Sequence, residues 1–419
     1  MYRGISINLF NLVLSFSDAL DLASPELVQH QIRTAYIAWE LAKKTGMDRG
    51  DIENLVIAAL IHDVGALTAE EKINLHEADT IMTEPHCILG ESLLKNVPVF
   101  AAAARIIRLH HQKWQDWMPV VENPLTAQAQ ILNLSDYVER SINRSRYILH
   151  QDRGIIERVS QLAETDIQSG IIDIFKDVAK REDFWLTITS PRIYSLLYHE
   201  ATYRSIVLDL SDLKSVSEIF RNLIDFRSRF TATHSAGVST SAALLARYFG
   251  LTEWEIELME ITGNLHDLGK LMVPNSILEK QDKLTSEEFA IMKQHTYFTY
   301  MTLCTVNGLE EIAEWAAFHH EKLDGSGYPF HLRANKLSMI SRILAVADIF
   351  TALTEDRPYR AGMSLTEAMT IIKDMDIKGM LDQNVVKVLE HNLADIASET
   401  KQQQAKAREF YENVFPANN

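Results

Sequence analysis

The chain carries one ordered series of histidine and aspartate residues twice. Each copy has a single His, then a His-Asp pair, another single His, a His-His pair and a final Asp. The first copy consists of His30, His62, Asp63, His86, His110, His111 and Asp136, and the second of His234, His266, Asp267, His295, His319, His320 and Asp348. The offset between the copies drifts only slightly, from 204 residues (positions 30 and 234) to 212 (positions 136 and 348). Such a repeat, broken only by small insertions, predicts a duplicated domain.

The sequence around both copies has the period of an α-helix. In each copy the leading His shares a helix face with apolar residues, and a glycine, Gly46 or Gly250, follows the run. Few segments alternate polar and apolar residues as strands do. We therefore predict an all-α protein with two tandem helical domains, residues 1–205 and 206–419, joined within Tyr203 to Leu213.

The bulk composition restricts the partners. A length of 419 residues accommodates two domains of ordinary size. The net charge of −16 argues against polymeric nucleic acid, because phosphate backbones bind cationic surfaces. A small phosphorylated ligand stays compatible, because bound cations supply local positive charge. Cys87 and Cys304 lack paired spacing, which favours a reducing, cytoplasmic setting. The absence of a long apolar run predicts no membrane span, and Met1 to Phe16 is expected to form a core helix.

The second series offers too many ligands for one tetrahedral ion. Five imidazoles and two carboxylates suit two ions with octahedral preference, such as Fe, Mn or Ni, whereas zinc is less suited. Two ions about 3.5–4 Å apart would hold a hydroxide for attack on phosphorus and polarise a phosphoryl oxygen. Asp267 is the expected bridging ligand, because it directly follows His266.

A glycine-broken turn follows the His-His pair of the second copy. The string is His319-His320-Glu321-Lys322-Leu323-Asp324-Gly325-Ser326-Gly327-Tyr328-Pro329. It resembles the signature of the HD-GYP phosphodiesterases, HHExxDGxGYP, at every fixed position. The string His266-Asp267-Leu268-Gly269-Lys270 resembles the family's HDxGK pattern, and the segment from Ala352 to Arg360 resembles its Arg-Pro-Tyr segment. The chain thus resembles a tandem protein, with an HD domain followed by an HD-GYP domain.

The resemblance implies the roles of individual residues. One ion would be held by His234, His266, Asp267 and Asp348, and the other by Asp267, His295, His319 and His320. Asp267 and Lys270 would be catalytic. The substrate would contact Lys270, Gly325, Gly327, Tyr328, Arg357 and Arg360. The implied reaction opens one phosphodiester of a cyclic dinucleotide, cyclic di-GMP or 3′,3′-cyclic GMP-AMP, and gives a linear 5′-phosphorylated dinucleotide. Some members of the family cleave further.

One departure concerns the number of ions. Some HD-GYP proteins hold a third metal ion with a Glu four residues before the first His of the series. That position is Phe230 in this chain, and a phenyl ring cannot ligate a metal. The sequence therefore predicts two ions in the C-terminal domain.

The N-terminal copy keeps the ligand series but lacks the accompanying motifs. Ala66 stands where Lys270 stands in the second copy, and neither a Gly-Tyr-Pro turn nor an Arg-Pro-Tyr segment follows. This domain is thus a candidate second metal site through His30, His62, Asp63, His86, His110, His111 and Asp136. Three roles stay open: sensing a ligand or protein, hydrolysing another phosphorylated molecule, or folding and forming a homodimer. We expect it to be regulatory or structural.

Two other functions compete with the phosphodiesterase. The chain could be a catalytically silent receptor for a cyclic dinucleotide, or an HD phosphohydrolase acting on another nucleotide. The intact His266, Asp267 and Lys270 favour an enzyme over a receptor. The Gly-Tyr-Pro turn favours a cyclic dinucleotide over other phosphate esters.

Overall fold

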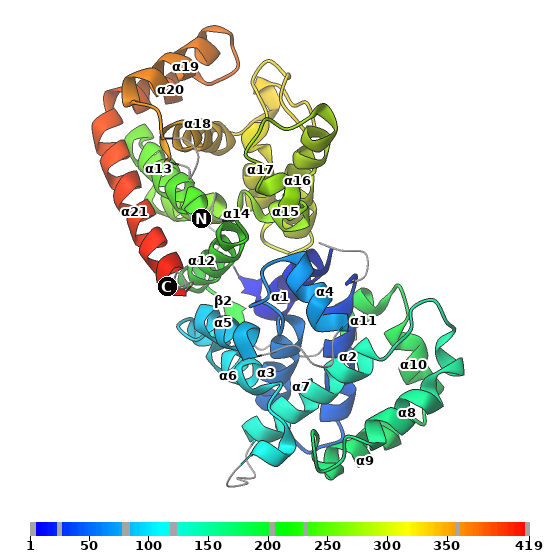
Figure 1. Ribbon diagram of the computed structural model, residues 1–419. Helices are drawn as coiled ribbons and strands as arrows, with labels where there is room; N and C mark the ends of the chain where they lie inside the picture. Colours follow the sequence, from blue (N-terminus) through cyan, green and yellow to red (C-terminus); the bar gives the residue numbers. More distant parts are fainter. Residues whose placement is uncertain are drawn as a thin grey trace. The chain divides into compact units, whose positions relative to one another are not determined.

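The computed structural model describes residues 6–22, 27–77, 84–117, 124–200, 206–228, 233–356 and 361–414 (Figure 1). Phe230, Arg357 and Arg360 lie outside these ranges. The described residues are overwhelmingly helical, and the strands β1 (Ile7–Asn8) and β2 (Val207–Leu208) form a two-stranded sheet. The predicted all-α class is confirmed. The chain divides into two compact units, one comprising Asn8–Val207 and the other mainly Leu208–Asn419.

The N-terminal unit is built from short helices joined by turns. Its helices are α1 (Leu9–Asp21), α2 (His30–Ala42), α3 (Arg49–Leu60), α4 (Ala69–Glu77), α5 (Glu84–Leu94), α6 (Ala101–Leu109), α7 (Pro124–Arg140), α8 (Asp152–Ser160), α9 (Ser169–Val178), α10 (Glu182–Ile188) and α11 (Ile193–Glu200). The 3₁₀ segments of its described residues are η1 (Pro98–Phe100), η2 (Trp114–Asp116) and η3 (Ile148–His150). Of the core helix predicted over Met1 to Phe16, residues 1–5 lie outside the described ranges and Ile7 and Asn8 form β1. The helix α1 begins at Leu9, and its side chains are almost all buried.

The C-terminal unit repeats the order of the elements that carry the ligand series. Its helices are α12 (Leu210–Phe226), α13 (His234–Phe249), α14 (Glu253–Leu265), α15 (Asn275–Leu278), α16 (Ser286–Cys304), α17 (Glu310–Ala317), α18 (Met339–Thr354), α19 (Leu365–Ile377), α20 (Gln383–His391) and α21 (Leu393–Val414). The 3₁₀ segments are η4 (Leu268–Met272), η5 (Phe318–His320) and η6 (Ala334–Lys336). Helices α13, α14, α16, α17 and α18 thus follow one another as α2, α3, α5, α6 and α7 do.

Local sequence signals fix several boundaries of these helices. Thr252 and Glu255 form a reciprocal capping box at the start of α14, and Thr285 and Glu288 do the same at the start of α16. Gly250 ends α13 in the left-handed conformation, with φ of 88°. These boundaries determine where the ligand-bearing turns begin.

The core of the C-terminal unit supports the ligand-bearing helices. Helix α13 packs against α14, α18 and α21, as Figure 1 shows for α13 and α21. Buried apolar side chains such as Val238, Met259, Leu344 and Phe350 fill the space between them. The site therefore lies on helices that are fixed by a shared apolar core.

Among the described helices, none has both the length and the apolar character that crossing a bilayer requires.

Candidate metal centre

The second ligand series converges from five segments of the C-terminal unit. His234 is the first residue of α13, and His266 and Asp267 form the turn that ends α14. His295 lies within α16, His319 and His320 form the end of η5, and Asp348 lies within α18. All seven predicted ligands therefore meet in one place, and all except His320 are buried.

Asp267 stands at the centre of this cluster. Its Oδ1 lies 3.4 Å from His295 Nε2 and 3.9 Å from His319 Nε2. Its Oδ2 lies 3.2 Å from His266 Nε2 and 3.9 Å from His234 Nε2. The two oxygens of one carboxylate thus face two different pairs of imidazoles, which is the arrangement that a bridging ligand needs.

Asp348 connects the remaining histidines. Its Oδ1 lies 3.2 Å from His234 Nε2, and its Oδ2 lies 3.6 Å from His320 Nδ1. The hydrogen bonds that the protonated His234 donates to Asp348 and Glu355 raise its pKa to about 10, although burial alone would lower it. A positive charge is therefore stabilised where the two carboxylates meet His234.

Backbone carbonyls orient the imidazoles toward the cluster. The Nδ1 atoms of His266, His295 and His319 lie 2.8, 2.7 and 2.6 Å from the carbonyl oxygens of Gly263, Met292 and Ala316. Because a carbonyl oxygen can only accept, each Nδ1 carries the proton and each Nε2 offers a lone pair. Metal-ligating histidines are oriented in this way by their outer ring nitrogen.

The buried donors of the cluster fit a cation. Among the described residues, His266 Nε2 and Asp267 Oδ1 have no hydrogen-bond partner although both are buried. Burial lowers the pKa of His295 to about 3, so its imidazole is neutral, as a metal ligand must be. Burial alone would raise the pKa of Asp267, but His266 and Lys270 hold it well below its usual range. The residues present therefore suit divalent ions.

Glu355 supports His234 from outside the cluster, a role that the sequence did not reveal. Its Oε2 lies 3.2 Å from His234 Nδ1, and its Oε1 accepts a 2.6 Å hydrogen bond from Thr233. Glu355 is buried at the end of α18. In the N-terminal unit the corresponding carboxylate, Glu139, stands at a different sequence distance from the last Asp of the series. The repeat therefore carried no signal for Glu355.

Two glycines bring the His-Asp turn onto the next ligand helix. A Cβ on Gly269 would overlap the carbonyl oxygen of His295, and a Cβ on Gly65 would overlap that of His86. Only glycine permits this approach. The close contact places Asp267 beside His295 and Asp63 beside His86.

Lys270 lies at the site but not in the predicted geometry. Because Lys270 stands four residues after His266, the sequence predicts that both lie on the same face of one continuous helix. Instead α14 ends at Leu265, and Lys270 belongs to the 3₁₀ segment η4. The prediction of a shared helix face is wrong, because the turn at Asp267 ends the α-helix. The Lys270 ammonium donates to Asp267 Oδ2 from three residues away.

The glycine-broken turn folds against the His-His pair. Buried Glu321 accepts hydrogen bonds from the backbone of Phe330 (2.7 Å) and Leu332 (2.9 Å), which holds the turn in place. Gly327 packs so closely on the backbone of His320 to Lys322 that a Cβ would clash. The family resemblance predicts that Gly327 contacts the substrate. The described contacts of Gly327 are with the protein's own backbone, and its role in substrate binding stays a prediction.

An aromatic wall borders the cluster beside this turn. The ring of Tyr328 lies 4.9 Å from that of His320 and 5.9 Å from that of Phe289 on α16. The ammonium of Lys293 lies 5.0 Å from the Phe289 ring and 5.8 Å from the Tyr328 ring. Sequence reasoning found Tyr328 through its motif. It missed Phe289 and Lys293, because no motif distinguishes this phenylalanine and this lysine from the other residues of the helix.

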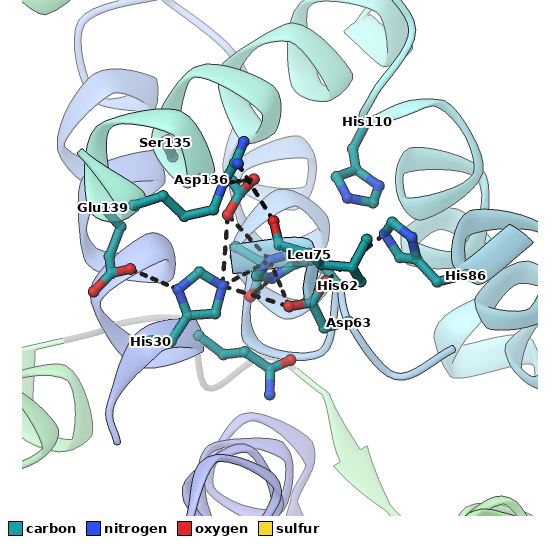
Figure 2. A network of polar contacts seen from close by, with 12 residues as sticks. His30, His62, Asp63, Leu75, His86, His110, Ser135, Asp136 and Glu139 are labelled. Atoms are coloured by element: carbon teal, nitrogen blue, oxygen red, sulfur yellow. Dashed lines mark hydrogen bonds and ion pairs between the residues drawn. The ribbon is translucent and has the colours of Figure 1, made fainter. Parts of the chain in front are cut away.

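The first ligand series also converges, in the N-terminal unit (Figure 2). His30 Nε2 lies 3.3 Å from His62 Nε2, 3.4 Å from Asp63 Oδ2 and 3.5 Å from Asp136 Oδ1. His86 Nε2 lies 3.7 Å from Asp63 Oδ1. The rings of His110 and His111 lie 5.3 and 5.1 Å from that of His86. The candidate N-terminal residues are therefore also brought together.

Two charged residues border the N-terminal cluster. Glu139 Oε2 lies 2.6 Å from His30 Nδ1 and supports it as Glu355 supports His234. Arg140 Nε lies 2.9 Å from Asp136 Oδ2, the oxygen whose counterpart faces His320 in the other unit. A guanidinium therefore neutralises one carboxylate of this cluster, and Ala66 leaves it without an equivalent of Lys270.

The sequence matches known domain models in both units. Two models, each described as an HD domain, match residues 27–141 and 218–385. The chain belongs to the HD-domain family. Each unit therefore contains one HD domain, and the C-terminal one carries the HD-GYP motif.

Two relatives align with this HD-domain protein over most of their own length. The chain is 29% identical to 3'3'-cGAMP-specific phosphodiesterase 1 of Vibrio cholerae, over 92% of both chains. It is 25% identical to 3'3'-cGAMP-specific phosphodiesterase 3 of that organism, over 87% of this chain and 90% of the relative. A cyclic di-GMP phosphodiesterase of Thermotoga maritima is 36% identical over 44% of this chain and 51% of its own.

A solved structure shares the fold. The crystal structure of the V. cholerae cyclic GMP-AMP phosphodiesterase V-cGAP3 matches with a TM-score of 0.64 and 20% identity, over 93% of this chain and 98% of that one. At this identity the likeness supports the tandem HD fold alone.

Proposed function

We propose that the C-terminal HD-GYP domain is a metal-dependent phosphodiesterase that opens one phosphodiester of a cyclic dinucleotide and gives a linear 5′-phosphorylated dinucleotide. The observation that carries the proposal is the position of Asp267, whose two oxygens face separate pairs of imidazoles inside a buried site. The names of the relatives, all cyclic-dinucleotide phosphodiesterases, support the same reaction.

Two divalent ions, of the Fe, Mn or Ni class, fit the ligand set. We assign His234, His266, Asp267 and Asp348 to one ion, and Asp267, His295, His319 and His320 to the other. Such a pair supplies Lewis acidity at phosphorus and lowers the pKa of water. Neutral imidazoles with Nε2 lone pairs turned inward and two ionised carboxylates provide the donors that this chemistry needs.

Lys270 is the group best placed to interact with the phosphate. Its ammonium is paired with Asp267 and partly exposed, so it lies between the buried carboxylate and solvent. With Asp267 engaged as a metal ligand, its hold on the ammonium would weaken, and Lys270 would donate to a phosphoryl oxygen. The positive charge then opposes the negative charge that develops on the phosphoryl group.

The aromatic wall is the proposed place for a substrate base. Tyr328 and Phe289 present ring faces and edges within stacking range of each other, next to the ligand His320. Gly325, Gly327 and Tyr328 belong to this turn, and Arg357 and Arg360 stay predicted phosphate contacts. The Lys293 ammonium beside the wall supplies a further positive charge for an anionic ligand.

3′,3′-cyclic GMP-AMP is the proposed preferred substrate. The two relatives matched along about nine tenths of their own length are both named for it, whereas the T. maritima cyclic di-GMP enzyme is matched over half. The N-terminal domain, proposed as residues 1–205, is then regulatory or structural. Arg140 neutralises the Asp136 carboxylate, and Ala66 leaves the cluster without the cation that Lys270 provides in the C-terminal cluster.

A two-substrate assay tests this proposal. Full-length protein loaded with Mn²⁺ or Fe²⁺ is incubated with each cyclic dinucleotide, and the products are resolved by chromatography. We expect a linear 5′-phosphorylated product from both, formed faster from 3′,3′-cyclic GMP-AMP. The Asp267→Asn variant should lose turnover, whereas Asp282→Asn, at an exposed aspartate of the same domain, should retain it. Tight binding without turnover would instead support a receptor.

A further inference from the structure

A buried arginine holds the turn that carries Lys270. Arg227 follows the last residue of α12, the helix that packs against α14 and η4. Its Nη1 donates a 2.7 Å hydrogen bond to the carbonyl oxygen of Lys270. Its Nη2 donates a longer one, of 3.4 Å, to the carbonyl oxygen of Val273, directly after η4. One planar guanidinium therefore binds two carbonyls of this segment.

Asn275, the first residue of α15, fixes the guanidinium in this position. Arg227 Nη2 donates a 2.9 Å hydrogen bond to Asn275 Oδ1. The side-chain amide of Asn275 donates in return to the backbone carbonyl of Arg227, at 3.3 Å. The end of α12 is thus tied to the start of α15, which follows η4 in the chain. We call Arg227 and Asn275 the η4 clamp.

The η4 clamp contains a buried positive charge without a carboxylate partner. Arg227 is buried, and among the described residues its Nε has no hydrogen-bond partner. Burial lowers the pKa of Arg227 to about 10, and no carboxylate of the described ranges offsets this effect. Burying an unpaired charge destabilises a fold, so stability does not account for this arginine. What the guanidinium positions is the better explanation.

A second buried carboxylate shows how the two HD domains align at this point. Asp21 Oδ2 accepts a 2.9 Å hydrogen bond from the backbone N–H of Gln31. Asp225 Oδ2 accepts one of 3.1 Å from the backbone N–H of Ser235. Each carboxylate stands nine residues before the first His of its own series. The copies therefore align without an insertion between this Asp and the first His.

This alignment shows that the clamp arginine and the lysine occur together. In the sequence, Arg227 aligns with Ala23 of the N-terminal copy, and Lys270 aligns with Ala66. The N-terminal copy thus keeps the whole ligand series but has neither cation. The arginine is therefore associated with Lys270 rather than with the metal ligands that both copies share.

We infer that Arg227 and Asn275 are positioning residues for Lys270, an inference that rests on the function proposed above. The clamp binds the backbone carbonyl of Lys270 and so fixes where this side chain leaves the backbone. The ammonium is thereby held beside Asp267, from where it is directed at the phosphoryl group. A misplacement of about 1 Å in such a group can lower a rate by about 10²-fold.

Kinetics of the full-length, Mn²⁺-loaded protein test the inference. We expect Arg227→Met to lower kcat for 3′,3′-cyclic GMP-AMP by about 10- to 100-fold, with KM and metal content nearly unchanged. Asn275→Ala removes one hydrogen bond from the clamp and should lower kcat by about 3- to 10-fold. Arg247→Met, at an exposed arginine of the same domain, and Ser276→Ala, at an exposed serine beside Asn275, are the matched controls.

A double-mutant cycle separates positioning from a purely structural role. In the Lys270→Gln background the lysine is absent, so Arg227→Met should lower kcat further by less than about 3-fold. A purely structural role would instead give the same loss in both backgrounds. Thermal unfolding and elemental analysis check that each variant is folded and retains its metal. If Arg227→Met does not fold, Asn275→Ala takes its place in the cycle.

The outcomes separate this inference from the function on which it rests. Unchanged kcat in both folded clamp variants, or equal losses with and without Lys270, would overturn the inference and leave the phosphodiesterase proposal intact. Loss of metal from the clamp variants would also overturn it, because the clamp would then support the metal centre. No turnover of either cyclic dinucleotide by the unmodified protein would overturn both.

Discussion

Glu355 contacts the outer ring nitrogen of His234, with Oε2 3.2 Å from Nδ1, while the inner nitrogen of the same ring faces Asp348 at 3.2 Å. The imidazole is therefore held on both sides by carboxylates. In metal sites such outer partners fix the tautomer and orientation of the ligand and raise its basicity.

We predict that Glu355→Gln weakens metal binding by roughly 10- to 100-fold, because the glutamine cannot hold His234 with a negative charge. Calorimetric titration of the metal-free protein with Mn²⁺ measures this change. Glu367→Gln removes an exposed carboxylate that caps α19 in the same domain and should leave the affinity unchanged. Equal metal affinities for Glu355→Gln and the unmodified protein would show that His234 needs no such support.

We predict that Lys270→Gln lowers kcat while the bound metal is retained. The ammonium is proposed to act on the phosphoryl group, and removing one electrostatic donor of this kind costs on the order of 10²–10³ in rate. Product formation gives the rate, and elemental analysis gives the metal content. Lys283→Gln, at an exposed lysine of the same domain, is the matched control. A variant that loses metal along with activity would make Lys270 a support of Asp267 rather than a contact of the substrate.

We predict that Phe289→Ala raises KM and leaves kcat within a few-fold. Stacking of a base on an aromatic ring contributes about 1–3 kcal/mol, which corresponds to a roughly 5- to 150-fold weaker interaction. Tyr297 is the matched control, because it lies on the same helix and is 43% exposed, close to the 42% of Phe289. If Tyr297→Ala and Phe289→Ala change KM equally, the aromatic wall does not form the base site.

We predict a pH-dependent gain of stability in the N-terminal domain for Asp18→Asn. Burial, reinforced by Asp21, raises the pKa of Asp18 to about 6. The folded state therefore binds the proton of Asp18 more tightly than the unfolded state does. The stabilisation that this proton provides is lost as the pH rises from about 4 through 6. The variant should match the unmodified protein near pH 4 and exceed it by about 1–2 kcal/mol at pH 7, allowing for partial exposure.

Thermal unfolding of the full-length protein between pH 4 and 7.5 measures this difference. Asp282→Asn, at an exposed position, should show none. The same Tm for Asp18→Asn and the unmodified protein at pH 7 would mean that the Asp18 carboxylate is solvated in the folded chain.

The sequence predicted the all-α class because the helical period and the repeated ligand order leave few alternatives. It also named the side chains that meet in each cluster, since few residue types ligate metals and their order recurs. The supporting carboxylates could not be predicted in this way. Glu139 follows Asp136 by three residues, whereas Glu355 follows Asp348 by seven, so the repeat does not align them. Residues three and seven positions after a given residue lie near the same face of a helix, so either spacing can bring a carboxylate to the first His of the series.

Other features depended on backbone detail that periodicity does not contain. The period around His266 extends across a point where the α-helix changes to a 3₁₀ turn, so the position of Lys270 was predicted wrongly. In the sequence, Arg140 cannot be distinguished from other basic residues at helix ends. Its role follows only from its contact with Asp136. The position of Phe289 beside Tyr328 arises from packing between α16 and a distant turn, which no local pattern encodes.

Anomalous diffraction from crystals of the Mn²⁺-loaded full-length protein tests the central claim most directly. Our account predicts two peaks in the C-terminal domain about 3.5–4 Å apart, one on each side of the Asp267 carboxylate. A single peak, a third peak in that cluster, or two peaks that do not share Asp267 would contradict it.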